Sequence, residues 1–175
     1  GYYNRAIAYL QKQEYRKSLD DFNRLLKLLP EDASVFLQRG IVYRKLNQFD
    51  PAIDDLSMAV TLKPEFAEAY YQRGQTYLLN GDYDQAYSDF LFALKSKPND
   101  ARTLYGMACF YARGQGDNKM AIKYLKRAIR QGFNDRQKLL TDPHFKMIRK
   151  SKAFKGLLKQ ILLRNNKPKI SAKGS

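Results

Sequence analysis

Residues 67–100 read AEAYYQRGQTYLLNGDYDQAYSDFLFALKSKPND, and this stretch decides the fold because its landmark residues recur along the chain. The recurrence has a fixed step of 34 residues, and it holds for three kinds of residue at once. The recurring residues are the tyrosines Tyr9, Tyr43, Tyr77 and Tyr111, the prolines Pro30, Pro64 and Pro98, and the small residues Ala6, Gly40, Gly74 and Ala108. Such a period indicates an internal repeat, which defines the architecture before any single propensity is considered.

The second half of each repeat has landmarks of its own, a small residue followed by a large apolar one and then by another apolar or small one. They are Ser18, Phe22 and Leu25, then Ala52, Leu56 and Ala59, then Ala86, Phe90 and Ala93. In the fourth copy the corresponding residues, Ala121, Leu125 and Ala128, come one position late. We therefore predict a one-residue insertion in a turn over 114–118, where a loop would tolerate it.

Each repeat is predicted to form two antiparallel helices. Apolar residues in 67–80 fall at helical spacing, and Gly81 follows as a typical C-terminal stop. A second helix is expected over 84–96, closed by Pro98, which has no amide hydrogen to continue the ladder.

These landmarks resemble the tetratricopeptide repeat, whose signature is W-x2-L-G-x2-Y, then A-x3-F, then P. The resemblance implies an all-α fold, a right-handed superhelix of stacked helix pairs, with repeats at 1–32 (truncated at its front), 33–66, 67–100 and 101–134. Two signature positions depart from the family. The tryptophan position holds Tyr2, Phe36, Tyr70 and Leu104, and the leucine position holds Arg5, Arg39, Arg73 and Met107.

The last repeat of such an array needs a cover for its apolar flank, and residues 135–164 are predicted to supply it as a helical cap. Asp142 followed by Pro143 is typical of a helix start. An amphipathic stripe then follows, and the whole segment resembles the closing segment after bacterial tetratricopeptide arrays. The stripe consists of Phe154, Leu157, Leu158, Ile161 and Leu162. Residues 165–175 are polar and basic, and we expect them to be disordered.

The net charge of +15 is confined to the end of the chain. Residues 1–118 hold 15 basic and 15 acidic residues, whereas residues 119–175 hold 17 and 2. We expect a solvated lysine face and a solubilising tail, with nucleic acid as the first alternative partner, and an acidic protein surface or, less favoured, an anionic membrane surface as the others. The alternative would act through Lys150, Lys152, Lys155, Lys159, Arg164, Lys167 and Lys169.

No catalytic constellation is evident, and we predict a noncatalytic protein without a cofactor or metal. The only histidine, His144, and the only cysteine, Cys109, are interpreted as structural. The run at 114–117 is interpreted as a turn, because it lacks the Gly-Lys-Ser/Thr ending of a phosphate loop. The carboxylate pairs at 20–21 and 54–55 recur on second helices and are interpreted as solvated.

The resemblance implies a function in binding, because the first helices of such arrays line a concave groove that holds peptides. The predicted groove residues are Tyr3, Ile7, Leu10, Gln11, Leu37, Ile41, Arg44, Lys45, Tyr71, Gln75, Leu78, Leu79, Tyr105, Cys109, Ala112 and Arg113. Their tyrosine-rich, aliphatic character favours a protein or peptide partner that is apolar or aromatic with some acidic character. The alternative is that several of these residues pack between helices or are covered by the chain's own ends.

One subclass of partner is disfavoured. Family members that clamp the C-terminal carboxylate of heat-shock chaperones use asparagine, arginine and lysine at fixed first-helix positions. Here Asn4 fits, but Gln38, Gln72 and Gly106 do not, and Glu68 stands where the lysine is expected.

Compartment and assembly are only weakly defined by the sequence. A lone cysteine favours the cytoplasm, although a signal peptide removed upstream of Gly1 is an alternative. The front edge of the first repeat is a candidate surface for pairing two copies.

Overall fold

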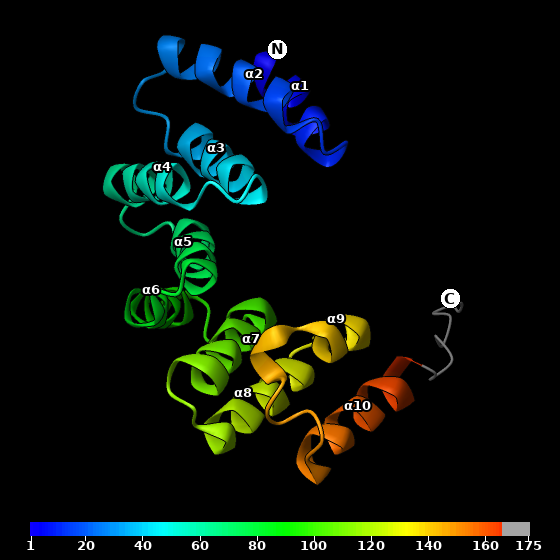
Figure 1. The fold of residues 1–175 in the computed structure, drawn as a ribbon. Helices are drawn as coiled ribbons and strands as arrows, with labels where there is room; N and C mark the ends of the chain where they lie inside the picture. Colours follow the sequence, from blue (N-terminus) through cyan, green and yellow to red (C-terminus); the bar gives the residue numbers. More distant parts are fainter. Residues whose placement is uncertain (166–175) are drawn as a thin grey trace, which may run out of the picture. The chain divides into compact units, whose positions relative to one another are not determined.

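The computed structural model describes residues 1–165, and within that range the secondary structure is helices joined by turns, with no strand. None of its helices combines the length and the apolar character needed to cross a bilayer. The chain divides into two compact units, residues 1–98 (unit 1) and residues 99–175 (unit 2). Figure 1 labels the helices of both units.

Unit 1 contains three helix pairs, and each helix packs against the next one in the chain. The predicted helices at 67–80 and 84–96 are confirmed with shifts of at most one residue. The bounds are α1 Tyr2–Gln11, α2 Tyr15–Leu28, α3 Ala33–Lys45, α4 Phe49–Leu62, α5 Ala67–Asn80 and α6 Tyr83–Ser96. The first helices of successive repeats also neighbour one another, since α1 contacts α3 and α3 contacts α5. The array of helix pairs expected from the period is therefore present.

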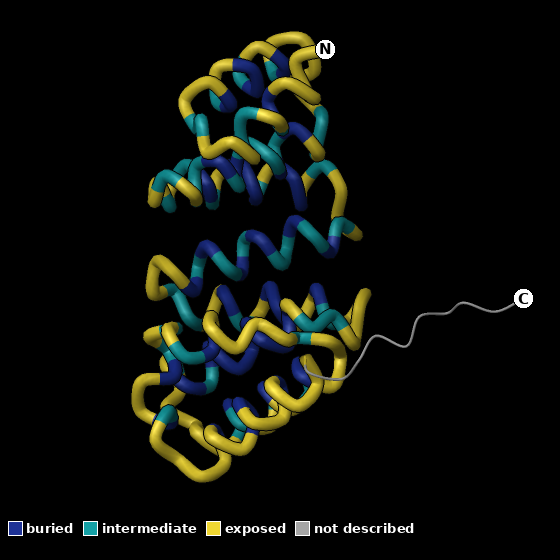
Figure 2. Tube along the Cα trace, turned by 90° about the vertical axis from the view of Figure 1, so that its right-hand side faces the viewer, coloured by how far each residue is buried: buried dark blue, intermediate teal, exposed yellow. Residues whose placement is uncertain are grey.

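Small residues allow the two helices of a pair to approach closely. Gly74 on α5 faces Phe90 on α6, and a Cβ atom built on Gly74 would lie 2.8 Å from Phe90 Cε1 and 3.3 Å from the Ala86 carbonyl oxygen. Phe90 is fully buried, so it has little freedom to move away. Figure 2 shows the resulting pattern, with buried stretches along the helices and exposed turns between them.

We expect Gly74→Ala to destabilise the protein by about 1–3 kcal/mol, because overpacking against Phe90 exceeds the gain in helix propensity. Gly156 in the last helix has no atom within 4 Å of a built Cβ, so Gly156→Ala is the matched control and should raise stability slightly. Urea unfolding followed by circular dichroism measures both. Equal effects of the two substitutions would contradict the packing argument.

The turn inside each repeat contains one residue with left-handed backbone. Gln13 (φ 61°) and Asn47 (φ 58°) occupy this position in the first two repeats, and Gly81 (φ 93°) occupies it in the third. In the fourth copy Gly116 (φ 66°) stands one residue late. The extra residue of the fourth repeat therefore precedes Gly116.

Unit 2 begins with the fourth helix pair, and the inserted residue lies inside its first helix. The helix α7, Ala101–Cys109, continues into a π-helical turn, η1, Phe110–Gly114, before α8, Asn118–Arg130. The Gln115 amide donates to the Phe110 carbonyl, five residues back, at 3.2 Å. A π-helical turn is the usual way for a helix to absorb one extra residue. The extra residue is thus absorbed by the π-helical turn and not by a loop, whereas residues 115–117 of the predicted turn do lie outside the helices, between η1 and α8.

The cap of unit 2 consists of α9, Arg136–Thr141, the short 3-10 helix η2, Pro143–Phe145, and α10, Lys152–Asn165. Asp142 caps η2, as expected, but the long helix starts only at Lys152. Four residues of the predicted apolar stripe are buried, whereas Leu162 is 47% exposed and does not belong to the core. Asn165, which was assigned to the tail, ends α10, and the rest of the predicted tail lies outside the described residues.

Candidate functional site

Three arginines stand where the repeat signature has leucine, and each holds an aspartate of its own repeat with two hydrogen bonds. Arg39 on α3 bonds Asp55 on α4 at 2.7 Å through both Nε and Nη2, and Arg73 on α5 bonds Asp89 on α6 at 2.8 Å in the same way. Arg5 bonds Asp21 likewise at 2.7 Å. This fork geometry suits a guanidinium facing a carboxylate.

Two of these arginines also reach the preceding repeat. Arg39 Nη1 donates to Asn23 on α2 at 2.8 Å, and Arg73 Nη1 donates to Ser57 on α4 at 3.1 Å. Their side chains are 20% and 18% exposed, whereas the side chain of Arg5 is 51% exposed. Each of the two inner arginines therefore ties three helices together.

The aspartates of these pairs are buried, so the interpretation of positions 21 and 55 as solvated carboxylates was wrong. The hydrogen bond from Arg5 lowers the pKa of Asp21. The hydrogen bond to Asp55 raises the pKa of Arg39, whereas burial raises the pKa of Asp55 against the opposing effect of that hydrogen bond. The sequence held a signal for them, since an arginine and an aspartate sixteen residues later recur at the repeat period. These pairs are structural, and the binding face has to be sought elsewhere.

The predicted groove residues of unit 1 lie on α1, α3 and α5, which neighbour one another. Leu37 and Leu78 are almost fully buried and contribute to packing, and Ile7, Leu10 and Ile41 pack in part against the core. The other residues of the predicted set keep at least part of their surface in solvent: Tyr3, Gln11, Arg44, Lys45, Tyr71, Gln75 and Leu79.

A polar bridge crosses this face between α3 and α5. Arg44 Nη2 donates to Gln72 Oε1 at 2.8 Å, and Gln72 Nε2 donates to Glu68 Oε1 at 2.8 Å. Arg44 Nε is buried and has no hydrogen-bond partner among the described residues. Burial also lowers the pKa of Arg44, because desolvation disfavours the charged form of the guanidinium. An anionic or carbonyl oxygen placed beside it would be favourable.

The ring of Tyr71 borders this bridge on α5. It lies 6.4 Å from the ring of the buried Phe90, measured between centroids, which anchors one side of Tyr71 while part of its surface stays in solvent. Gln72 and Glu68, which the clamp comparison singled out as mismatches, belong to the same bridge. The bridge was not predicted, because it depends on contacts between neighbouring repeats.

A pocket of about 610 Å³ lies elsewhere in unit 1 than the Arg44–Gln72 bridge. It is formed by the turn after α2 and the end of α4, and its lining includes Leu28, Leu29 and Lys63. None of its lining residues belongs to the predicted groove set.

In unit 2 the predicted groove residues are mostly covered by the cap. Tyr105 is 4% exposed, stacks on Phe133 at 4.6 Å between ring centroids, and donates to Asp142 Oδ2 at 2.6 Å. Cys109 and Ala112 are buried as well, whereas Arg113 is exposed. Tyr105 is therefore covered by the C-terminal part of the chain, which was the alternative to a role in the groove.

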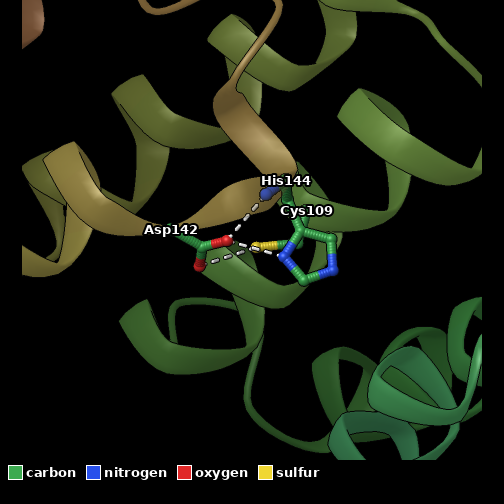
Figure 3. Close-up of side chains that lie close together, drawn as sticks. All are labelled: Cys109, Asp142 and His144. Carbon is green, nitrogen blue, oxygen red and sulfur yellow. Dashed lines mark hydrogen bonds and ion pairs between the residues drawn. The ribbon is translucent and has the colours of Figure 1, made fainter.

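Cys109, Asp142 and His144 come together in unit 2, as Figure 3 shows. Asp142 Oδ1 accepts from the His144 amide at 2.9 Å and lies 2.6 Å from His144 Nδ1, while Oδ2 faces the Cys109 thiol at 3.8 Å. With the bond from Tyr105, the carboxylate is surrounded by partners from its own unit. Burial raises the pKa of the Cys109 thiol, which opposes thiolate formation. The arrangement therefore suits a structural role, in which Asp142 holds the cap against α7.

The stability of unit 2 should depend on the charge of Asp142. Burial acts to raise the pKa of Asp142, but hydrogen bonds from His144 and Tyr105 outweigh burial and hold it below the ordinary value. A lowered pKa in the folded state stabilises the protein above the unfolded pKa of about 3.9, and this contribution is lost as the pH falls through the folded pKa. We expect the stability gap between wild type and Asp142→Asn to be present at neutral pH and to shrink in acid. Urea unfolding measured from neutral to acidic pH tests this expectation. A difference in stability between wild type and Asp142→Asn that did not change with pH would contradict a stabilising role for the charge of Asp142.

The basic residues of the alternative site are solvent-exposed as far as the structure describes them. Lys150, Lys152, Lys155 and Lys159 are exposed, and Arg164 donates to the carbonyl oxygens of Ile129 and Arg130 at the end of α8. Lys167 and Lys169 lie outside the described residues.

The repeats found in sequence and structure define a solenoid of helix pairs, and the chain belongs to the tetratricopeptide repeat (TPR) family. Matches to TPR families cover residues 1–32, 40–81, 67–100 and 101–131. No curated protein sequence matches the chain.

Solved structures with this fold include YrrB, a TPR protein with an unusual peptide-binding site. It is 29% identical, with 75% of this chain and 67% of that chain covered and a TM-score of 0.66. MamA from Desulfovibrio magneticus RS-1 is 18% identical, with coverage of 93% and 90% and a TM-score of 0.74. The first TPR domain of Spaghetti (RPAP3), bound to the HSP90 peptide SRMEEVD, is 19% identical, with coverage of 69% and 87% and a TM-score of 0.58. TPR proteins generally mediate protein–protein interactions, and this fold is typically a noncatalytic scaffold.

Proposed function

We propose that the protein is a noncatalytic interaction scaffold that binds a peptide segment of a partner on the first-helix face of unit 1. The observation that carries this proposal is the poorly solvated Arg44, bridged to Gln72 on the next repeat. A bound segment with an acidic or carbonyl oxygen near Arg44 would compensate the desolvation of its guanidinium.

The first-helix face of unit 1 favours apolar contacts as well. Tyr3 and Tyr71 offer ring surface, and Ile41 lies on the same helix as Arg44 and is half-buried. Tyrosine and arginine are the residue types that contribute most at protein interfaces. The partner is therefore a segment with apolar or aromatic side chains and some acidic character. Peptide binding by YrrB is consistent with such a use of this fold.

The test is selection of binders from a random peptide library on the intact chain, followed by titration of the selected peptides. We expect Tyr71→Ala to weaken their binding about tenfold or more, since it removes an aromatic contact of hot-spot type. Met58→Ala is the matched control, because Met58 is an exposed apolar residue on the second helix α4. Binding that is lost equally in the control, or unaffected by Tyr71→Ala, would refute the first-helix face as the site.

A further inference from the structure

Charge is divided between the two units of the structure. Unit 1 contains 13 basic and 13 acidic residues, and unit 2 contains 19 and 4. From Pro143 onward there is no acidic residue. Unit 2 therefore presents a strongly positive surface whose partner would be anionic.

Two helices of unit 2, α8 and α10, run side by side in the same direction (Figure 1). At their ends, Arg164 of α10 donates to the carbonyl oxygens of Ile129 and Arg130 of α8. At their beginnings, Lys119 of α8 and Ala153 of α10 line the same pocket. The line of contact between α8 and α10, called the seam below, is thus closed at one end by these hydrogen bonds, and a pocket opens it at the other end.

The open end is a pocket of about 410 Å³ with mainly apolar walls. Its lining consists of Asn118, Lys119, Ile122, Met147, Ile148, Ser151 and Ala153. Met147 is 78% exposed, and its flexible thioether side chain can adapt to an apolar group entering the pocket. A pocket of this kind has room for one aliphatic side chain.

Exposed cations continue from this pocket along α8. Lys119, Lys123, Lys126 and Arg130 recur every three or four residues, so they form one stripe on the helix surface. We propose that the seam between α8 and α10 is a second binding site, which takes an acidic peptide segment of a partner protein that inserts one aliphatic side chain into the pocket.

The same surface suits nucleic acid less well. Phe145 and Phe154, the two aromatic residues in the segment without acidic residues that begins at Pro143, are fully buried, so neither ring is available to stack on a base. Lysines alone would bind a phosphate backbone without using the pocket. The pocket beside the lysine stripe is what favours a peptide that carries both acidic residues and an apolar anchor.

The probes are two labelled synthetic peptides, each made of Glu and Ser residues, one with a central Leu and one with Ser in its place. We expect the Leu peptide to bind about tenfold more tightly, as the burial of one aliphatic side chain implies. Ala153→Phe, which fills the pocket from an exposed position, should abolish this preference. Lys119→Glu with Lys123→Glu should weaken both peptides at least tenfold.

The matched control is Lys12→Glu with Lys27→Glu, which reverses two exposed lysines of unit 1 and should leave both peptides bound as in wild type. Circular dichroism verifies that each variant is folded. Equal binding of the two peptides would overturn the proposal. So would tighter binding of duplex DNA or phosphatidylserine vesicles that is unchanged in Ala153→Phe, because the surface would then be a general polyanion site. Tyr71→Ala in unit 1 should not affect these probes, so this test is separate from that of the first-helix face.

Discussion

Replacing Arg73 by methionine is expected to destabilise the protein by about 3–5 kcal/mol, because it leaves the carboxylate of Asp89 buried without its partner. The guanidinium makes two bonds to Asp89 and one to Ser57, so the loss affects both helices of the third repeat and the repeat before it. Urea unfolding followed by circular dichroism measures the change.

The fourth repeat suggests how to restore that stability. In the fourth repeat, Met107 occupies the position of Arg73 and is fully buried. When the inserted residue is counted, Tyr124 occupies the position of Asp89, and its ring stacks on that of Tyr111 with 5.3 Å between centroids. Exchanging a buried ion pair for apolar packing is often neutral or stabilising. We therefore expect Arg73→Met combined with Asp89→Tyr to recover most of the stability lost in the single variant.

Arg5→Met is the matched comparison, because the side chain of Arg5 is 51% exposed and water can partly replace it beside Asp21. Its effect should be clearly smaller than that of Arg73→Met. A single variant as stable as wild type, or a double variant no better than the single one, would show that the pair does not act as described.

Asp142→Ala is expected to loosen the cap of unit 2 and to destabilise it by about 3 kcal/mol, through loss of a helix cap and an unsatisfied buried hydroxyl. The substitution removes the acceptor of the Tyr105 hydroxyl and of the His144 amide, and it leaves the Cys109 thiol facing a void. Hydrogen exchange should show faster exchange of amides in α9 and α10, with amides of α1–α5 unchanged.

Asp135→Ala provides the control for that measurement. Asp135 caps α9 by accepting from the Lys138 amide at 2.8 Å, but it is exposed, so only the cap itself is lost. We expect an effect of about 1 kcal/mol. Equal effects at the two aspartates would mean that the buried contacts of Asp142 contribute nothing.

The sequence alone predicted the fold in detail wherever the repeat period applies. The tyrosines, prolines and small residues at the fixed step located the helix pairs, and Gly81 marked the end of α5. These features are local, because helix spacing and turn chemistry depend on residues close together in the chain.

Features that join distant or nonperiodic residues were not predicted. Asp142 meets Tyr105 and Cys109 across more than thirty residues, outside the repeat pattern. The π-helical turn at 110–114 could not be told from a loop insertion, since both add one residue. Burial of Leu37, Leu78 and Tyr105 likewise depends on how helices and the cap pack, which the first-helix positions alone do not define.

The hydrogen bonds of Arg5, Arg39 and Arg73 in unit 1 have a consequence for the rate of folding. Each of these side-chain hydrogen bonds, whether within a repeat or to the preceding repeat, joins two residues that are sixteen apart in the chain. Contacts of such short separation allow fast folding that can begin in any repeat and spread to its neighbours. The same locality lets one helix pair open and close again while its neighbours stay folded. The α1–α2 pair, held by the half-exposed Arg5, should open more readily than the pairs held by Arg39 and Arg73, so a partner that binds α1 would meet the most easily opened of these three pairs.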